Sequence, residues 1–264
     1  MEKVIIIGCG WLGFPLAQSL IRNKYNVIGT STSSEKKSLF NNNNIDFQYL
    51  DFNSNSEIPT FEQVNYFVVA IPPSKVSEYS VKINEVAKIY SDLNPTAKWI
   101  FISSTSVYKP SSRIASVSIP YEGLDSNSNL VQTELLLRKT LSESLTIIRM
   151  AGLLGGNRHP IFFISKRGNL SNADAPVNMI HLTDAVNLIV HVIQSNFFGK
   201  VLNGCYPYHP SKKEFYTNAS RYFKLTPPKF EKGGELDKIV DLSDNELKFN
   251  YSSMIDYSCK PFSS

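Results

Sequence analysis

The sequence contains few cysteines, three in 264 residues: Cys9, Cys205 and Cys259. They lie far apart, and none has a second cysteine two or four positions away. This spacing argues against a zinc site and against a disulfide framework. A chain of this length buries enough surface to fold without such cross-links, as one large domain or one domain with a small lobe. We therefore expect a cytoplasmic protein, kept in a reducing environment.

Long apolar runs and blocks of like charge are also missing. No apolar run approaches the roughly 18 residues that span a bilayer. The N-terminal segment lacks the apolar core and cleavage site of a signal peptide. The net charge of +4 comes from 27 basic and 23 acidic residues, without a run of five like charges. We expect a soluble protein that binds neither membrane nor nucleic acid, although a small phosphate-bearing ligand needs only a few of those charges.

Strand-like and helix-like patterns alternate along the first part of the chain. The predicted strands cover residues 3–7, 25–29, 47–50, 66–71, 99–103 and 146–149, and the predicted helices cover 12–22, 34–40, 74–91, 130–142, 183–194 and 212–223. Several strands are apolar nearly throughout, as expected for strands covered on both faces. This alternation predicts an α/β fold with a doubly wound parallel sheet of the Rossmann type.

Three glycines follow the first predicted strand with the spacing G-x-G-x-x-G: Gly8, Gly10 and Gly13. In such a loop the first glycine makes a tight turn, the second lets the backbone approach a diphosphate, and the third packs the helix on the strand. The pattern predicts that a dinucleotide contacts the whole loop, which also contains Cys9, Trp11 and Leu12. A methyltransferase loop for an adenosyl cofactor and a purely structural turn remain alternatives.

The end of the second predicted strand bears on which dinucleotide is bound. It reads Thr30-Ser31-Thr32, without a carboxylate, and Lys36 and Lys37 follow. A carboxylate at this place would hold the ribose hydroxyls of NAD, but it would repel the 2′-phosphate of NADP. Hydroxyls and ammonium groups can accept that phosphate. The sequence therefore favours NADP over NAD, with a solvated loop as the alternative interpretation of these residues.

Composition changes after about Gly152, where strands become sparse and Pro, Gly, Asn and His collect in loops. We therefore expect a dinucleotide-binding Rossmann domain over residues 1–152. Residues 153–264 should form a mixed segment that completes the sheet and builds a small C-terminal substrate lobe.

Four motifs carry a resemblance to a known family. The segment "WIFISSTSVY" from Trp99, together with the glycine loop, resembles the extended short-chain dehydrogenase/reductases, the NAD-dependent epimerase/dehydratase family. The segments "IRMAGLLGGNRHP" from Ile148, "HLTDAV" from His181 and "LNGCYPYHPSKKEFY" from Leu202 look most like its small atypical, YeeZ-like branch in bacteria. The resemblance extends to about Phe230.

The resemblance implies further site residues. Asp51 would lie near the adenine, while Ala70, Ile71 and Pro72 would follow the fourth strand against the cofactor. Ser103 would line the same site, and Ser104 would occupy the catalytic Ser/Thr position and polarise a carbonyl. Asp51 could instead be a turn residue, and the Pro72-Pro73 pair could simply end a strand. The resemblance also implies a possible homodimer.

The family's proton-transfer pair, Tyr-x-x-x-Lys, is missing at its expected place. Counting back from Glu134, which resembles the acid after the family lysine, the two positions fall on Ser126 and Leu130. Only Tyr208 and Lys212 have the right spacing, far beyond the expected place and among prolines. A positioned acid or base contributes a factor of about 10² to 10⁴. Standard catalysis is therefore not expected.

Other residues could replace the missing Tyr-Lys pair or contact a ligand. Tyr108 and Tyr121 follow Ser104 and could supply a phenol, although Tyr108 could also be a wall of the site and Tyr121 a surface residue. Arg158 and His159 lie beside glycines in "GGNRHP" and could contact an anion or a substrate.

Two functions remain open at this point. The first is an NADP-binding oxidoreductase or epimerase-like enzyme with non-standard or weak redox chemistry on a small polar substrate, sugar-like or carbonyl-bearing. The second is a non-catalytic, dinucleotide-binding regulator or interaction protein.

Overall fold

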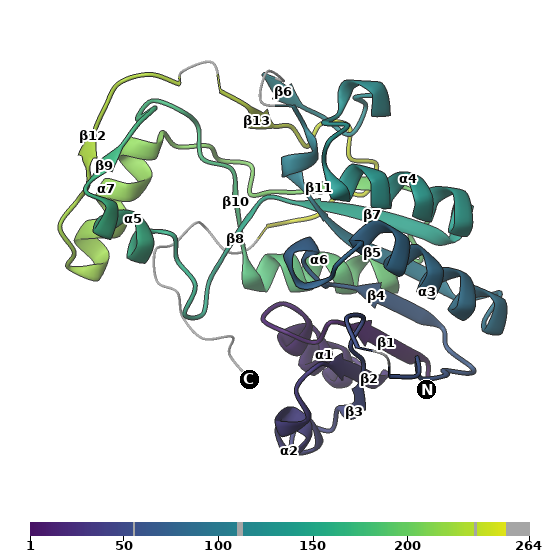
Figure 1. The fold of residues 1–264 in the computed structure, drawn as a ribbon. Coiled ribbons are helices and arrows are strands. Elements are labelled where there is room, and N and C mark those ends of the chain that lie inside the picture. The colour runs from purple at the N-terminus through teal and green to yellow at the C-terminus, as the bar shows by residue number, and fades with distance from the viewer. Residues whose placement is uncertain (55, 110–112, 235–236, 252–264) are drawn as a thin grey trace.

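The computed structural model describes residues 1–54, 56–109, 113–234 and 237–251 (Figure 1); Cys259 lies outside them. Its centre is a seven-stranded sheet in the order β11-β7-β5-β4-β1-β2-β3, and every neighbouring pair is parallel. The strands are β1 (Lys3–Ile7), β2 (Asn26–Ser31), β3 (Asp46–Tyr49), β4 (Tyr66–Val69), β5 (Lys98–Ser104), β7 (Leu145–Met150) and β11 (Val201–Gly204). The predicted Rossmann-type sheet is confirmed. Its strand order reverses between β1 and β4, which makes this the topological switch point.

Helices cover both faces of the sheet, because the crossover connections of parallel strands need them. They are α1 (Gly13–Arg22), α2 (Lys37–Asn41), α3 (Tyr79–Leu93), α4 (Asn129–Leu141) and α6 (Leu182–Gln194). Helix α3 packs against α4, and α1 packs against α6. The central strands are accordingly apolar on both sides, and the Ile5 and Ile6 side chains of β1 are fully buried.

The chain after β7 builds a lobe beside the sheet and also returns to the sheet with β11 (Figure 1). The lobe contains β8 (Gly152–Leu154), α5 (Ile161–Arg167), β9 (Asn169–Leu170), β10 (Met179–His181), α7 (Lys212–Phe223) and β12 (Lys229–Phe230). A second, smaller core holds it together, with Leu154, Ile161 and Phe215 at its centre. Strand β13 (Ile239–Val240) then pairs with β6 (Ile114–Ala115) and ties the C-terminal segment to the Rossmann part.

Some predicted elements differ from the observed ones, and the short strands outside the central sheet were not predicted. The helix predicted over 74–91 begins only at Tyr79, since Pro73–Lys75 form a short 3₁₀ turn and Glu78 has a φ of +51°. Strand β11 and helix α5 were not predicted. Within the described ranges, no helix is both long and apolar enough to cross a membrane.

Candidate functional site

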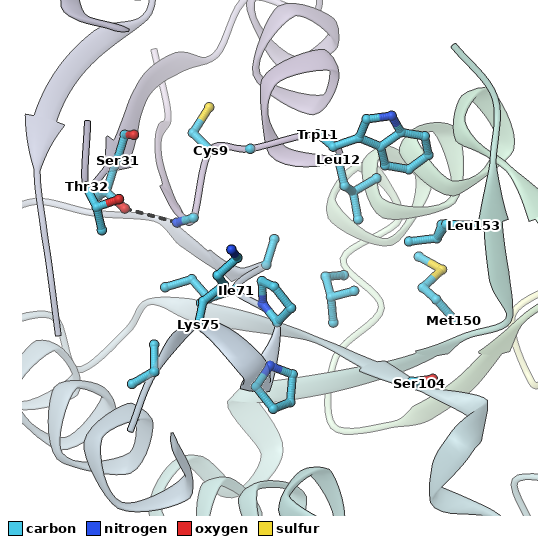
Figure 2. Close-up of a pocket in the computed structure, with 18 of the residues that line it drawn as sticks. Cys9, Trp11, Leu12, Ser31, Thr32, Ile71, Lys75, Ser104, Met150 and Leu153 are labelled. Carbon is cyan, nitrogen blue, oxygen red and sulfur yellow. Dashed lines mark hydrogen bonds between the residues drawn. The ribbon is translucent and has the colours of Figure 1, made fainter. Parts of the chain in front are cut away.

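A cavity of about 750 Å³ opens at the carboxyl ends of β1, β2, β4 and β5, at the switch point of the sheet. This is where ligands bind in doubly wound folds. Most of the cofactor residues proposed from the sequence line it: Gly8, Cys9, Gly10, Trp11, Leu12, Thr30, Ser31, Thr32, Asp51, Ala70, Ile71, Pro72 and Ser103. Figure 2 shows part of this lining. Gly13 stands one turn behind it, at the start of α1.

The glycine loop has the geometry that its spacing predicts. Gly8 has a φ of +94°, and a Cβ there would lie 2.5 Å from Ile71 Cγ1. A Cβ on Gly13 would lie 2.6 Å from the Gly8 carbonyl oxygen, so this glycine permits the close contact of strand and helix. A Cβ on Gly10 would meet no protein atom within 4 Å. Gly10 therefore keeps open the space in front of the loop.

The same loop presents unpaired backbone donors. Cys9 N–H donates to the Thr30 carbonyl at 2.8 Å and Gly10 N–H to the Gly8 carbonyl at 2.8 Å. No acceptor within the described residues takes the N–H groups of Trp11 and Leu12, which precede the first turn of α1. Free N–H groups and the helix dipole together favour an anion at this place. The loop therefore fits the diphosphate of a dinucleotide.

One end of the cavity is rich in hydroxyl and ammonium groups. Ser31 ends β2 and Thr32 follows it, and Lys36 and Lys75 also line the cavity. Figure 2 shows Ser31, Thr32 and Lys75 on one side of the cavity. Asp51 accepts the backbone N–H of Asn53 at 2.9 Å and so also acts as a turn residue. Lys75 was missed from the sequence, although it closely follows the prolines after β4.

The opposite end of the cavity is mostly apolar. In Figure 2, Trp11, Leu153, Met150 and Ser104 lie on this side. The Ser104 Oγ accepts the backbone N–H of Ser106 at 3.1 Å, which leaves its own O–H to be donated to a ligand. The segment 150–153, which supplies much of this wall, was also missed as a site, although it lies within a motif that carries the family resemblance.

The two residues at the positions that the resemblance assigns to the Tyr-Lys pair lie in different environments. Leu130, in the lysine position, is buried and lines the cavity. Ser126, in the tyrosine position, is exposed and precedes α4, in a turn closed by the bond from Ser128 N–H to the Asp125 carbonyl at 3.0 Å. At the position that the resemblance assigns to the lysine, the cavity therefore presents the isobutyl group of Leu130, and the residue that the resemblance assigns to the tyrosine is exposed in the turn before α4.

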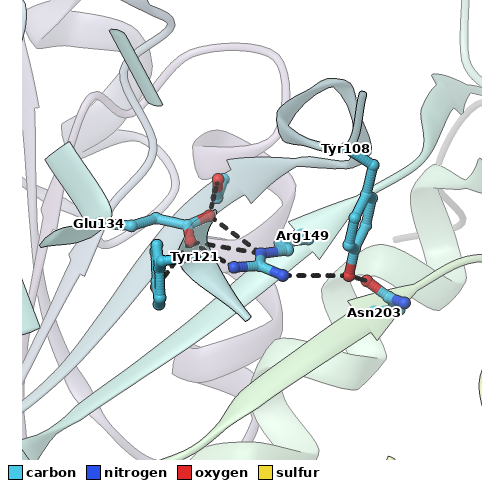
Figure 3. Close-up of polar contacts among 6 residues, drawn as sticks. Tyr108, Tyr121, Glu134, Arg149 and Asn203 are labelled. Atoms are coloured by element: carbon cyan, nitrogen blue, oxygen red, sulfur yellow. Dashed lines mark hydrogen bonds and ion pairs between the residues drawn. The ribbon is translucent and has the colours of Figure 1, made fainter. Parts of the chain in front are cut away.

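A buried polar network connects side chains of β5, β7, β11 and α4 (Figure 3). Arg149, on β7, forms an ion pair with Glu134, on α4, with 2.7 Å between Nη2 and Oε2 and both side chains at most 1% exposed. Ser103 donates to Glu134 at 2.6 Å. Because each charge is paired, this network can remain in a core from which water is excluded.

The two tyrosines proposed as proton donors belong to this network. The Tyr108 hydroxyl donates to Asn203 at 2.7 Å and accepts from Arg149 at 3.1 Å. The Tyr121 hydroxyl donates to Glu134 at 2.8 Å. Burial raises the pKa of both phenols, and the Glu134 carboxylate raises that of Tyr121 further. Neither tyrosine lines the cavity. The structure therefore does not bring these phenols to the end of the cavity that holds Ser104.

Arg158 and His159, the two candidate residues in the "GGNRHP" loop, lie in different environments. Arg158 lines the cavity, with its guanidinium 5.1 Å from the centre of the Trp11 ring. His159 is buried in the lobe, stacked on Phe215 with 5.4 Å between ring centres. Its Nδ1 accepts the Ile161 N–H at 3.1 Å, and burial lowers its pKa to about 4. The position of His159 therefore indicates a structural role and does not support a substrate contact.

The cavity-lining Cys9 thiol is buried as well. Burial raises its pKa to about 12, although the nearby Lys36 lowers it slightly. The thiol therefore stays protonated at neutral pH and is not an activated nucleophile.

Comparison with known proteins finds curated relatives that match nearly the whole chain. Protein YeeZ from Escherichia coli K12 is 31% identical over 268 residues, which cover 95% of this chain and 96% of that protein. No protein-family model matches the chain.

Solved structures share the fold at low identity. The UDP-glucuronic acid 4-epimerase from Bacillus cereus in complex with NAD has a TM-score of 0.73 and 17% identity, with 99% of this chain and 96% of that chain covered. The human epimerase family protein SDR39U1 (isoform 2) with NADPH has a TM-score of 0.64 and 14% identity, with 93% and 96% covered. Its near-full-length relative shows that the chain belongs to the same family as YeeZ, and the solved structures show that it shares its fold with NAD- and NADPH-bound epimerase-type proteins.

Proposed function

We propose that this protein is an NADP(H)-binding oxidoreductase that acts on a small carbonyl or hydroxyl compound without the family's Tyr-Lys pair. The observation that carries the proposal is the glycine loop, whose open Gly10 and unpaired Trp11 and Leu12 N–H groups face a cavity at the switch point. The fold neighbours described with NAD and with NADPH support a nicotinamide dinucleotide as the ligand.

The preference for NADP rests on charge. Lys36 and Lys75 come from different loops and line the end of the cavity that also holds Ser31 and Thr32. Ammonium and hydroxyl groups together match a phosphate monoester, which carries a charge near −2 and several acceptor oxygens. Asp51 is the one acid among the described residues that line the cavity, and its side chain already accepts a backbone N–H.

The chemistry divides between the ligand and the chain. A bound nicotinamide group supplies or accepts hydride. Ser104 donates its free O–H to the substrate oxygen, where negative charge develops, and an apolar surrounding strengthens such a bond. Since Leu130 and Ser126 replace the Lys and Tyr of the family, we infer that solvent exchanges the proton and that turnover is slower by about 10² to 10⁴ than with the pair.

The test is a comparison of Ser104→Ala with Ser106→Ala. Ser106 is exposed and does not line the cavity, and its contact with Ser104 is made by the backbone. With NADPH and a panel of carbonyl compounds and nucleotide sugars, we expect Ser104→Ala to lower kcat about 10²- to 10³-fold, with an unchanged Kd for NADPH. Ser106→Ala should match the wild type.

Two results would contradict this proposal in different ways. Unchanged turnover in Ser104→Ala would remove this residue from the mechanism. Tight NADPH binding without turnover of any compound in the panel would instead favour the non-catalytic regulator.

A further inference from the structure

The Ser104 hydroxyl is bonded by the peptide group that joins Thr105 to Ser106. The Ser106 N–H donates to the Ser104 Oγ at 3.1 Å. The carbonyl of the same peptide group belongs to Thr105 and accepts from the Lys238 ammonium at 3.0 Å. A trans peptide group is planar, with its C=O and N–H pointing in opposite directions. One peptide group therefore connects the Lys238 ammonium with the hydroxyl of Ser104, which Figure 2 shows at the apolar end of the cavity.

The backbone around Lys238 is held by both parts of the chain. The Ile239 N–H donates to the Arg113 carbonyl at 3.0 Å, where β13 pairs with β6 in the Rossmann part. On the side of the lobe, the Asn178 side chain donates to the Lys238 carbonyl at 2.8 Å and accepts the Val240 N–H at 2.8 Å. These contacts place the lysine side chain beside the turn that follows β5.

The Lys238 ammonium bonds to carbonyl oxygens and not to an acid. Besides the Thr105 carbonyl, it donates to the Tyr108 carbonyl at 3.2 Å, at the other end of the same turn. Among the described residues, no carboxylate forms an ion pair with it. Its half-buried position lowers the pKa of the lysine by desolvation. The positive charge is therefore directed at two peptide groups of this turn.

A cation at the carbonyl end of a peptide group changes how strongly its N–H end donates. The ammonium draws electron density toward the Thr105 oxygen, so the Ser106 N–H becomes a stronger donor. Hydrogen bonds in such a chain polarise and strengthen one another. Ser104 then donates its own O–H more strongly to a ligand. This gain is largest in the transition state, where negative charge develops on the substrate oxygen.

We propose that Lys238 is a positioning residue, which orients and polarises the Thr105–Ser106 peptide group and so strengthens the bond from Ser104 to the substrate. The inference rests on the proposed function, because it concerns the same hydroxyl. Lys238 does not line the cavity, so it acts through this peptide group without touching nucleotide or substrate. Leu130 fills the position that the resemblance assigns to the family's lysine, and the C-terminal segment supplies a cation from another direction.

The amide proton of Ser106 tests the coupling without a substrate. Its chemical shift in a proton–nitrogen correlation spectrum of the full chain rises with the strength of the hydrogen bond that it donates. Lys238→Met removes the charge and keeps an unbranched side chain, so it should lower this shift. Lys109→Met is the matched control, since Lys109 follows the same turn and also donates to a backbone carbonyl, that of Glu122 at 3.2 Å. It should leave the Ser106 shift unchanged.

Steady-state kinetics measure the consequence for turnover, with NADPH and the same panel of carbonyl compounds, benzaldehyde included. We expect Lys238→Met to lower kcat about tenfold, which is less than Ser104→Ala because the lysine acts through that serine. The KM of the carbonyl compound and the Kd for NADPH should stay unchanged, since the bond strengthens only in the transition state. Lys238→Arg keeps a charged donor and should restore part of the lost kcat. Lys109→Met should match the wild type.

Combining Lys238→Met with Ser104→Ala distinguishes action through Ser104 from a general loss of structure. If Lys238 acts through Ser104, its substitution should cost little kcat in the Ser104→Ala background. A full tenfold loss in that background, or a Ser106 amide shift that Lys238→Met does not move, would overturn the inference. Equal turnover in the wild type and Ser104→Ala, or none with any compound of the panel, would contradict the proposed function instead. The amide shift would still test the link from Lys238 to Ser106.

Discussion

Three aromatic rings surround His159 in the core of the C-terminal lobe: those of Phe162, Phe215 and Phe223. Its Nε2 has no hydrogen-bond partner within the described residues. A protonated imidazole would have to carry a charge in this apolar site, which explains why its pKa falls to about 4. The neutral ring acts as a flat packing element that also accepts one backbone N–H.

This burial predicts a pH dependence of stability. In the unfolded chain a histidine has a pKa of about 6.5, so between about 6.5 and 4 the unfolded state binds more protons than the folded one. The free energy of unfolding should therefore be constant above that window and fall as the pH falls through it. Urea unfolding between pH 7.5 and 4.5 measures the slope.

His159→Asn is the matched variant for this slope, because asparagine does not titrate in this range. Its lost packing should lower stability at every pH, while its curve should be flatter than that of the wild type. His209 also has a pKa lowered by burial and is common to both proteins. Two parallel curves would show that His159 is not the group that titrates.

At the scale of elements, substitutions in the turn between β1 and α1 can distinguish an effect on folding stability from an effect on ligand binding. Gly8→Ala places a Cβ 2.5 Å from Ile71 at a positive φ, so it should lower the free energy of unfolding by about 1–3 kcal/mol. Gly10→Ala meets no protein atom within 4 Å and should leave the stability of the free protein unchanged.

The two variants, Gly8→Ala and Gly10→Ala, should also respond differently to nucleotide. The Gly10→Ala methyl group stands where the backbone would approach the diphosphate, so we expect a loss of about tenfold or more in NADPH affinity. Chemical denaturation and isothermal titration calorimetry measure the two effects. Gly10→Ala that binds NADPH as tightly as the wild type would show that the diphosphate does not lie on this loop.

Elements with a strong local pattern could be predicted from the sequence, and the others depend on distant contacts. Strand β1 and helix α7 were predicted with their observed ends, Lys3–Ile7 and Lys212–Phe223, because their apolar periodicity is clear. Strand β11 was missed, since Asn203 and Gly204 interrupt its apolar run. Asn203 is tolerated in the core because it bonds to the Ala115 and Asp241 carbonyls and to Tyr108, all remote in sequence.

The same division holds for the candidate site. The glycine loop is a local feature, so its spacing was sufficient to place it. The ion pair of Glu134 with Arg149 and the bond from Tyr121 to Glu134 arise from the packing of α4 on the sheet, and Tyr108 joins the network through Arg149 on β7 and Asn203 on β11. In the sequence, Tyr108 and Tyr121 simply follow Ser104. Nothing in that order indicates that their phenols bond to buried partners and do not line the cavity.

At the scale of the whole molecule, the cavity depends on both parts of the chain. The Rossmann part supplies the glycine loop and Ser104, while the segment after β7 supplies Leu153 and Arg158. Lys238, near the C-terminal end of the described residues, donates to the Thr105 and Tyr108 carbonyls at 3.0 and 3.2 Å and so holds the loop that follows Ser104. A ligand in the cavity should therefore stabilise the whole molecule against unfolding.

The melting temperature with NADPH, with NADH and without nucleotide is the most direct test of the central claim, that this cavity binds a phosphorylated nicotinamide dinucleotide. At 100 times its Kd, a ligand raises the free energy of unfolding by about 2.7 kcal/mol. The account predicts a clear rise with NADPH, a smaller one with NADH at equal concentration, and no difference between them in a Lys36→Ala, Lys75→Ala double variant. No rise with either nucleotide at millimolar concentration would contradict it.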